Sequence, residues 1–320
     1  MASRLAVDAG ARARQAPGLQ VPLPFTLSAP LDRATFSATD DAEQAALAAA
    51  VLLQAIGASS GEPQIADIFE AWRSIVLPQA DGLWGSVADR SAIRNAVEGL
   101  TPPATGTDNP HFYDDSSVAR AVPVGIVYSG TPDQAARVAR RLASVTNDGV
   151  GVDAAAAFAS AIAVATSGGS TAEAVARAIA AIDGDSWLGR KLALAESILR
   201  ESESLIDAIP DWNDQVANLE YNFGNIAAET LPLALIIARE SASFAEAIGV
   251  ANLMPKQADT MPAMVGSLLG AVAGVEAIPP AWRERVETLR GYGVPSTAGV
   301  RLLEVAKELV RVRSDRAISA

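Results

Sequence analysis

Apolar residues recur along most of this chain at intervals of three and four positions, which is the spacing of one face of an α-helix. Leu47, Val51, Leu52 and Ile56 form one such series, and they follow a polar segment, residues 37–41, of the kind that commonly begins helices. No segment shows a convincing alternation of apolar and polar residues, the mark of a half-buried strand. The pattern predicts an all-α protein.

Further helices are expected wherever the same spacing lies between capping and breaking residues. Capping boxes are read at Thr131, Ser170 and Ser243. Residues 101–115, TPPATGTDNPHFYDD, are expected to form a long loop, and such loops are usually functional or disordered. The expected helices are 37–57, 64–77, 91–99, 131–143, 152–166, 170–182, 191–208, 227–239, 243–252, 262–275, 281–290 and 299–313.

The 320 residues have room for one large domain or two ordinary ones. They show no internal repeat and no linker between two different compositions, so residues 1–320 are predicted to form a single domain. Half of the residues are hydrophobic but only 5% are aromatic. The core must therefore be built mainly from small aliphatic side chains, which suit closely packed helices.

Charge and cysteine content exclude several classes of function. The net charge of −12 argues against a nucleic-acid partner, because phosphate binding needs clustered Lys and Arg. The absence of cysteine excludes disulfides, thiol catalysis and zinc–thiolate sites, and fits a cytoplasmic location. No signal peptide is recognisable, and the uncharged run 260–275 is short for a membrane span. We expect a soluble, cytoplasmic protein that has no membrane partner.

Two acidic clusters stand directly before apolar helices. The first is Thr39, Asp40 and Asp41, and the second is Asp259 and Thr260. Acidic residues often cap helices, and that is the simpler explanation for each cluster. Two adjacent acids cannot both serve one cap, however, and oxygen ligands of this type are those that Mg²⁺ or Ca²⁺ requires.

Three long stretches together resemble the ADP-ribosylglycohydrolase family, which includes dinitrogenase-reductase-activating glycohydrolase and a lens crystallin. TDDAEQAALAAAVLL is similar to the family's TDDT helix, and ARAVPVGIVYSGTPDQAARVARRLASVTNDG to its MR-x-x-P-x-G stretch. AETLPLALIIARESASFAEAIGVANLMPKQADTMPAMVGSLLGAVAGVEAIPPAW is similar to its C-terminal block, which contains GGDADT. SRLAVDAG echoes its opening helix. These pieces stand in the family's order along nearly the whole chain.

The resemblance implies a single orthogonal all-α domain with a cleft that holds Mg²⁺. In such enzymes the cations orient a ribose, and a carboxylate activates water at its anomeric carbon. By this resemblance Thr39, Asp40 and Asp41 fall on the TDD metal ligands, and Asp259 and Thr260 on the last two positions of GGDADT. Asp40, Asp41 and Asp259 are the expected catalytic carboxylates.

The sequence also departs from the family's motifs. Gln257 stands where the first Asp of GGDADT is expected, and Pro255 and Lys256 replace its glycines. A neutral amide oxygen binds Mg²⁺ weakly, so one or two ions are expected at a weakened or lost site, and Lys256 is a candidate electrostatic substitute. Asn147 takes a position where many relatives carry His, and Gln257 and Asn147 are also candidate substrate contacts.

The loop before the MR-like stretch supplies the remaining candidates for substrate binding: His111, Tyr113, Asp114, Asp115, Ser116 and Arg120. Aromatic rings here suit a base or a nicotinamide-like ring, and Asp114 and Asp115 either cap the next turn or bind a ribose. Arg120 either holds a phosphate or forms a buried salt bridge.

For some residues outside this loop the sequence allows two different positions in the fold. Trp84 is either a cleft wall or, by the favoured interpretation, part of the core. Asn222, Asn225 and Glu229 either face the cleft or belong to a turn and a helix cap.

No G-x-G-x-x-G or P-loop motif occurs, and a Ser-His-Asp triad would rest on the single histidine without a nucleophile elbow. We expect a glycohydrolase that cleaves the C1 bond of a ribosyl group in an ADP-ribosyl, nucleotide or nucleoside small molecule. The alternative is a non-catalytic relative that binds a nucleotide-like ligand or has a structural role.

Overall fold

The computed structural model describes residues 38–218, 220, 225–254 and 256–319. These residues form fifteen α-helices, with short 3₁₀ and π turns and two isolated β-bridges but no strand. The predicted all-α class is confirmed. Asn222, Pro255 and the stretch SRLAVDAG lie outside the described residues. The helices are α2 (Asp40–Ala58), α3 (Ile65–Val76), α4 (Val87–Val97), α5 (Ala104–Thr107), α6 (Ser116–Val127), α7 (Pro132–Ala143), α8 (Gly149–Ala165), α9 (Thr171–Ala180), α10 (Trp187–Glu201), α11 (Leu205–Asp211), α12 (Ala227–Glu240), α13 (Phe244–Ala251), α14 (Met261–Ala273), α15 (Pro280–Val286) and α16 (Leu302–Ser319).

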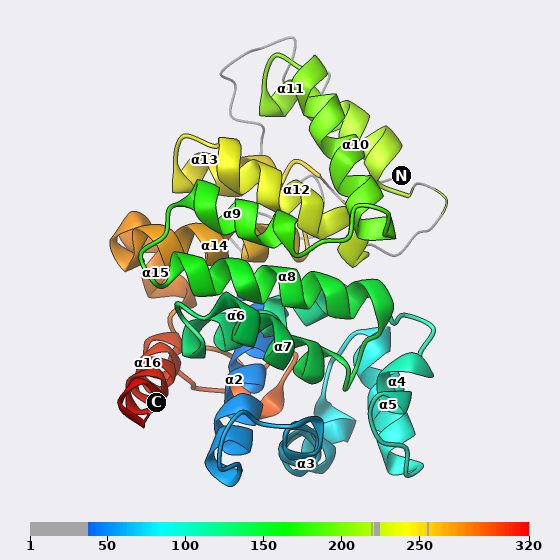
Figure 1. The fold of residues 1–320 in the computed structure, drawn as a ribbon, viewed down its shortest axis with the longest axis vertical. Helices are drawn as coiled ribbons and strands as arrows, with labels where there is room; N and C mark the ends of the chain where they lie inside the picture. The colour runs from blue at the N-terminus through cyan, green and yellow to red at the C-terminus, as the bar shows by residue number, and fades with distance from the viewer. Residues whose placement is uncertain (1–37, 219, 221–224, 255, 320) are drawn as a thin grey trace.

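Helix α8 runs through the middle of the molecule and separates two hydrophobic cores (Figure 1). Ala157 and Phe158 belong to the core shared with α9, α10, α12 and α14, whereas Ala155 and Ala159 belong to the core shared with α2, α3, α6 and α7. Alanine on both faces lets neighbouring helices approach closely. The alanine-rich sequence of α8 therefore reflects burial on all sides rather than an amphipathic surface helix.

Most expected helices are observed within a few residues of their expected bounds, with four differences. The short helix α5 lies inside residues 101–115, which were expected to form a loop. The single helix expected at 191–208 is wrong: α10 ends at Glu201, and the Ser204 side chain caps the separate helix α11. Helix α6 was not expected, because its Pro123 and the preceding loop obscure the helical spacing. At Thr131 the helix is correct but the capping box is absent, since the hydroxyl donates to the Tyr128 carbonyl instead.

In the described part of the chain, no helix is both long enough and apolar enough to cross a membrane.

Candidate functional site

The first acidic cluster lies at the beginning of α2, and its side chains do not cap the helix. Thr39 is the N-cap residue, but its side chain makes no cap hydrogen bond; the Asp40 carboxylate contacts its own backbone N–H. The Thr39 hydroxyl instead points to Asp41 Oδ2, at 3.5 Å. Asp40 is exposed and Asp41 is buried. The capping explanation therefore does not account for these carboxylates.

The second cluster lies at the beginning of α14 and gives the same result. Thr260 is the N-cap residue and makes no side-chain cap hydrogen bond. Thr260 is buried, whereas Asp259 is exposed and accepts a hydrogen bond from Asn225 Nδ2 at 3.4 Å. Helix capping thus explains neither of the two clusters that the sequence singled out.

Asp114 and Asp115, at the beginning of α6, have different roles. Asp114 Oδ1 accepts a hydrogen bond from the Ser116 backbone N–H at 2.9 Å, so this carboxylate orders the first turn. Asp115 is completely buried; the hydroxyls of Thr230 and Thr260 lie beside its carboxylate, but neither oxygen receives a hydrogen bond of normal geometry from the described residues. The buried Ser116 hydroxyl lies beside the Asp114 carboxylate. A buried carboxylate that lacks well-formed hydrogen bonds is expensive, so Asp115 calls for either a proton or a cation.

The pKa values show that the three helix starts meet in one place. Burial, and then the charges of Asp40, Asp115 and Asp259, raise the pKa of Asp41 well above its usual value. Burial and the charge of Asp114 raise the pKa of Asp115 to about 8; the neighbouring hydroxyls of Thr230 and Thr260 offset part of this rise. We call Asp40, Asp41, Asp115 and Asp259 the acid cluster. The positive ends of α2, α6 and α14 converge on it.

The acid cluster has an inner and an outer side. Asp41 and Asp115 are buried, while Asp40 and Asp259 are exposed. Although Asp40 lies at this exposed rim, the surrounding protein partly desolvates its carboxyl and raises its pKa, and the charge of Asp259 raises it further. A ligand that comes from solvent therefore meets Asp40 and Asp259 first.

The side chains around the cluster have the right chemistry for a hard divalent cation. All of the candidate metal-binding atoms are oxygens, and three of them receive no hydrogen bond of normal geometry from the described residues: both carboxylate oxygens of Asp115, and Gln257 Oε1. No three acidic or histidine side chains in the described ranges are already close enough together to hold an ion. The donor types therefore fit Mg²⁺, and the carboxylates would have to draw closer around it. The candidate donors are Thr39, Asp40, Asp41, Asp115, Gln257, Asp259 and Thr260.

Lys256 and Gln257 both contact Glu229, a fully buried carboxylate on α12. Lys256 Nζ lies 3.3 Å from Glu229 Oε2, and Gln257 Nε2 donates to the same oxygen at 3.1 Å. The Asn218 backbone N–H donates to Glu229 Oε1 at 2.9 Å. The positive charge of Lys256 therefore compensates Glu229, which makes neither a turn nor a cap contact through its carboxylate.

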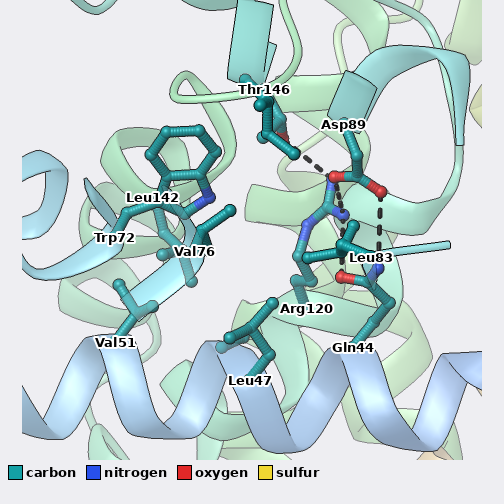
Figure 2. A pocket seen from close by; sticks show the side chains of 12 residues that line it. Gln44, Leu47, Val51, Trp72, Val76, Leu83, Asp89, Arg120, Leu142 and Thr146 are labelled. Atoms are coloured by element: carbon teal, nitrogen blue, oxygen red, sulfur yellow. Dashed lines mark hydrogen bonds and ion pairs between the residues drawn. The ribbon is translucent and has the colours of Figure 1, made fainter. Parts of the chain in front are cut away.

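Arg120 forms a buried salt bridge rather than an open anion site (Figure 2). Its guanidinium donates to Asp89 Oδ1 at 2.8 Å and to Gln44 Oε1 at 3.3 Å. It also donates to Thr146 Oγ1 and Asn147 Oδ1, both at 2.9 Å. Next to it lies a cavity of about 20 Å³, roughly the size of one water molecule, with Trp72 on its apolar side. Of the two alternatives for Arg120, the salt bridge is observed.

Asn147 connects the Arg120 network to the loop that precedes α6. Its Nδ2 donates to the carbonyls of Phe112, at 3.2 Å, and Asp114, at 3.0 Å. Asn147 is fully buried, so within this structure both it and Arg120 position the loop rather than present polar atoms to solvent. Their direct contact with substrate stays a prediction.

Tyr113 lies at the centre of a partly exposed aromatic group. Its ring centroid is 5.6 Å from that of His111, in a stacked arrangement, and 6.1 Å from that of Trp187, edge to face. Burial and the charge of Arg90 lower the pKa of His111, so the imidazole is uncharged at neutral pH. Because Tyr113 directly precedes Asp114, this group stays a candidate for substrate contact.

The favoured interpretation of Trp84 as a core residue is wrong, because the side chain is 77% exposed. The sequence analysis also missed Glu43, which is fully buried in the first turn of α2 and holds the backbone of residues 292–294. A glutamate one turn after the TDD motif resembles an ordinary helix-start residue. Its hydrogen-bond partners lie about 250 positions later in the sequence, and no sequence pattern predicts this contact.

Burial of the carboxyls predicts that the cation-free protein becomes less stable as the pH rises from about 4 to 8. Burial raises the pKa of Asp114 to about 6 and that of Asp115 to about 8, whereas both groups lose their protons near pH 4 when unfolded. The native state therefore binds more protons over this range, and each such carboxyl lowers the unfolding free energy by about 1.4 kcal/mol per pH unit. Urea unfolding in a chelating buffer at several pH values measures the slope. A flat or rising profile would contradict the burial of these groups.

Comparisons with known proteins agree with this architecture. The model of the ADP-ribosylglycohydrolase family matches residues 8–317. One solved chain, described as an "ADP-ribosylglycohydrolase-related protein complex", superposes with a TM-score of 0.61 at 22% sequence identity, over 98% of this chain and 96% of that chain. At this identity the likeness concerns the fold. None of the curated proteins matches the chain. Because the family model covers nearly all of the sequence, the chain belongs to the ADP-ribosylglycohydrolase family.

Proposed function

We propose that this protein is a glycohydrolase that cleaves the C1 bond of a ribosyl group in an ADP-ribosyl, nucleotide or nucleoside small molecule. Membership of the family supports hydrolysis of ADP-ribosyl-type substrates. The observation that carries the proposal is Asp115, whose fully buried carboxylate receives no hydrogen bond of normal geometry from the described residues. A purely structural protein would gain nothing from keeping such a group, because it lowers the stability of the fold.

The resident cation in this proposal is Mg²⁺, held by the acid cluster together with the hydroxyls of Thr39 and Thr260. When bound, it would neutralise the carboxylates and act as a Lewis acid toward the ribose hydroxyl oxygens. Gln257 contributes a neutral oxygen where an acid would bring charge, which supports weaker binding than an all-carboxylate site.

The carboxylates of the acid cluster provide the base for hydrolysis. Either Asp40 or Asp41 accepts a proton from the attacking water, whose oxygen forms the new bond to C1. The bond from C1 to the leaving group breaks, and its electron pair departs with that group. Of the two, Asp41 is buried and Asp40 is exposed. Asp259 lies on the exposed side with Asp40, where the substrate enters.

Replacement of Asp40 tests the proposed function directly. We expect Asp40→Ala to lower kcat by about 100-fold, typical of losing one acid–base or cation-binding group. The unfolding free energy should change by less than about 0.5 kcal/mol, because the residue is exposed. Product release from ADP-ribosyl conjugates, NAD⁺ and nucleosides is measured by chromatography, with and without Mg²⁺.

Asp133→Ala is the matched control, since Asp133 also lies in the first turn of a helix, α7, and is exposed. It should leave turnover unchanged. If the wild-type protein releases no product and Mg²⁺ does not raise its melting temperature, the enzyme proposal fails. A large loss of stability in Asp40→Ala would instead favour a structural role.

A further inference from the structure

Two aromatic side chains are unusually exposed for their size, and they lie on neighbouring segments. Trp84 is 77% exposed and Tyr292 is 76% exposed, more than the other large apolar side chains in the described part of the chain. The Trp84 backbone N–H donates to the Gly293 carbonyl at 2.8 Å, which ties the two segments together. Residues far apart in the sequence thus form one aromatic pair, Trp84 and Tyr292.

The aromatic pair belongs to the rim of the acid cluster, beside Asp40. Gly293 lies so close to the start of α2 that an added Cβ atom would be 3.0 Å from Asp40 Cβ and 3.3 Å from the Trp84 carbonyl oxygen. Only glycine fits between these groups without a shift of its neighbours. A molecule that contacts the Asp40 carboxylate therefore lies beside the two backbone segments that carry these rings.

The backbone that carries Tyr292 is held in place by Glu43. This buried carboxylate accepts hydrogen bonds from three successive backbone N–H groups, those of Tyr292, Gly293 and Val294, at 2.9, 2.7 and 2.9 Å. Such a concave run of N–H groups binds an anion firmly. Because the backbone is fixed, the exposed ring loses little conformational freedom when a ligand covers it, which favours binding.

We propose that Trp84 and Tyr292 are specificity-determining residues that stack on a planar heteroaromatic leaving group attached to the ribose C1 atom. The inference rests on the proposed function, since it is the inner carboxylates that would act on the opposite face of that ribose. Rings at the solvent side of the cluster contact the part of the substrate that departs to solvent. Aromatic side chains recognise a flat ring by stacking and do not need to match a hydrogen-bonding pattern.

Two ligands that differ by the heteroaromatic ring test the proposal without requiring turnover. NAD⁺ carries nicotinamide at the ribose C1, and ADP-ribose lacks it. In wild-type protein with Mg²⁺, NAD⁺ should bind at least 5-fold more tightly than ADP-ribose in a calorimetric titration. Trp84→Ala and Tyr292→Ala should each remove most of this preference while leaving ADP-ribose affinity within 2-fold, and Trp84→Phe should restore part of it. Trp282→Ala, which removes another partly exposed tryptophan, is the control and should keep the preference.

The outcomes separate this inference from the proposed function. Loss of affinity for both ligands alike in the two alanine variants would overturn the stacking role. Equal wild-type affinity for NAD⁺ and ADP-ribose would overturn it as well, even if the enzyme hydrolyses other ADP-ribosyl conjugates. Conversely, a ring preference that depends on Trp84 and Tyr292 in a protein without turnover would support the inference while the proposed catalysis failed.

Discussion

Asp115→Asn should stabilise the cation-free protein and at the same time abolish its response to Mg²⁺. At pH 8.5, where Asp115 is forced to ionise in its buried site, we expect the unfolding free energy to rise by about 2–4 kcal/mol in a chelating buffer. The neutral amide has nearly the same shape as the carboxylate and avoids a buried, unpaired charge. The increase in melting temperature that Mg²⁺ produces in the wild-type protein should disappear, and turnover should fall by at least 1,000-fold.

The matched control for this variant is Asp148→Asn. Asp148 is also a helix N-cap residue, of α8, and it also makes no side-chain cap hydrogen bond, but it is only partly buried. This variant should change neither stability, beyond about 0.5 kcal/mol, nor the response to Mg²⁺. Thermal unfolding in a chelating buffer measures the stability, and repeating it with Mg²⁺ measures the response to the cation. If Asp115→Asn destabilised the cation-free protein, the carboxylate would be a structural group and the candidate cation site would lose its main support.

Removal of the Lys256 ammonium should cause a large loss of stability. In Lys256→Met, Glu229 stays fully buried and loses the ammonium group that contacts it, so we expect the unfolding free energy to fall by about 3 kcal/mol. The Gln257 and Asn218 hydrogen bonds remain and prevent a greater loss. Urea unfolding at neutral pH in a chelating buffer measures the change.

Two further variants test the assignment of this loss to the buried ion pair. Lys307→Met removes an exposed pair with Glu304 and should cost less than about 0.5 kcal/mol. Adding Glu229→Gln to Lys256→Met should recover part of the stability, because no buried charge is then left unpaired. Equal effects of Lys256→Met and Lys307→Met would show that Lys256 does not compensate Glu229.

The sequence allowed the helices and the acidic residues to be predicted, because both depend on local patterns. Helical spacing is visible within a few turns, and Thr39-Asp40-Asp41 and Asp259-Thr260 stand at recognisable helix starts. The meeting of these two helix starts followed only from the family resemblance, and Asp115 was expected to cap the next turn or to bind a ribose, not to join them. Neither periodicity nor composition specifies which helix ends converge in space.

The features that escaped prediction depend on distant partners. In the sequence, Glu43 resembles a surface residue at a helix start. Only the folded structure shows that its carboxylate accepts hydrogen bonds from the backbone of residues 292–294. Trp84 is of a residue type that usually lies in the core, yet its side chain is exposed. Its backbone N–H is bonded to Gly293, more than 200 positions later in the sequence. Lys256 was considered as a substitute for a cation, and its contact with Glu229 depends on the packing of α12. Such pairings carry no signal in a single sequence.

The contact between Glu43 and residues 292–294 has a consequence for the order in which the molecule is completed. All four carboxylates of the acid cluster have been synthesised once the ribosome has passed Asp259, but the segment with Tyr292 emerges later. Until then Glu43 has none of these three backbone partners, and the rim beside Asp40 lacks one of its two rings. A chain that stops before this segment would therefore contain all four carboxylates of the acid cluster but would lack Tyr292 at the rim beside Asp40. The substrate selectivity that we infer would be acquired only in the last stage of synthesis.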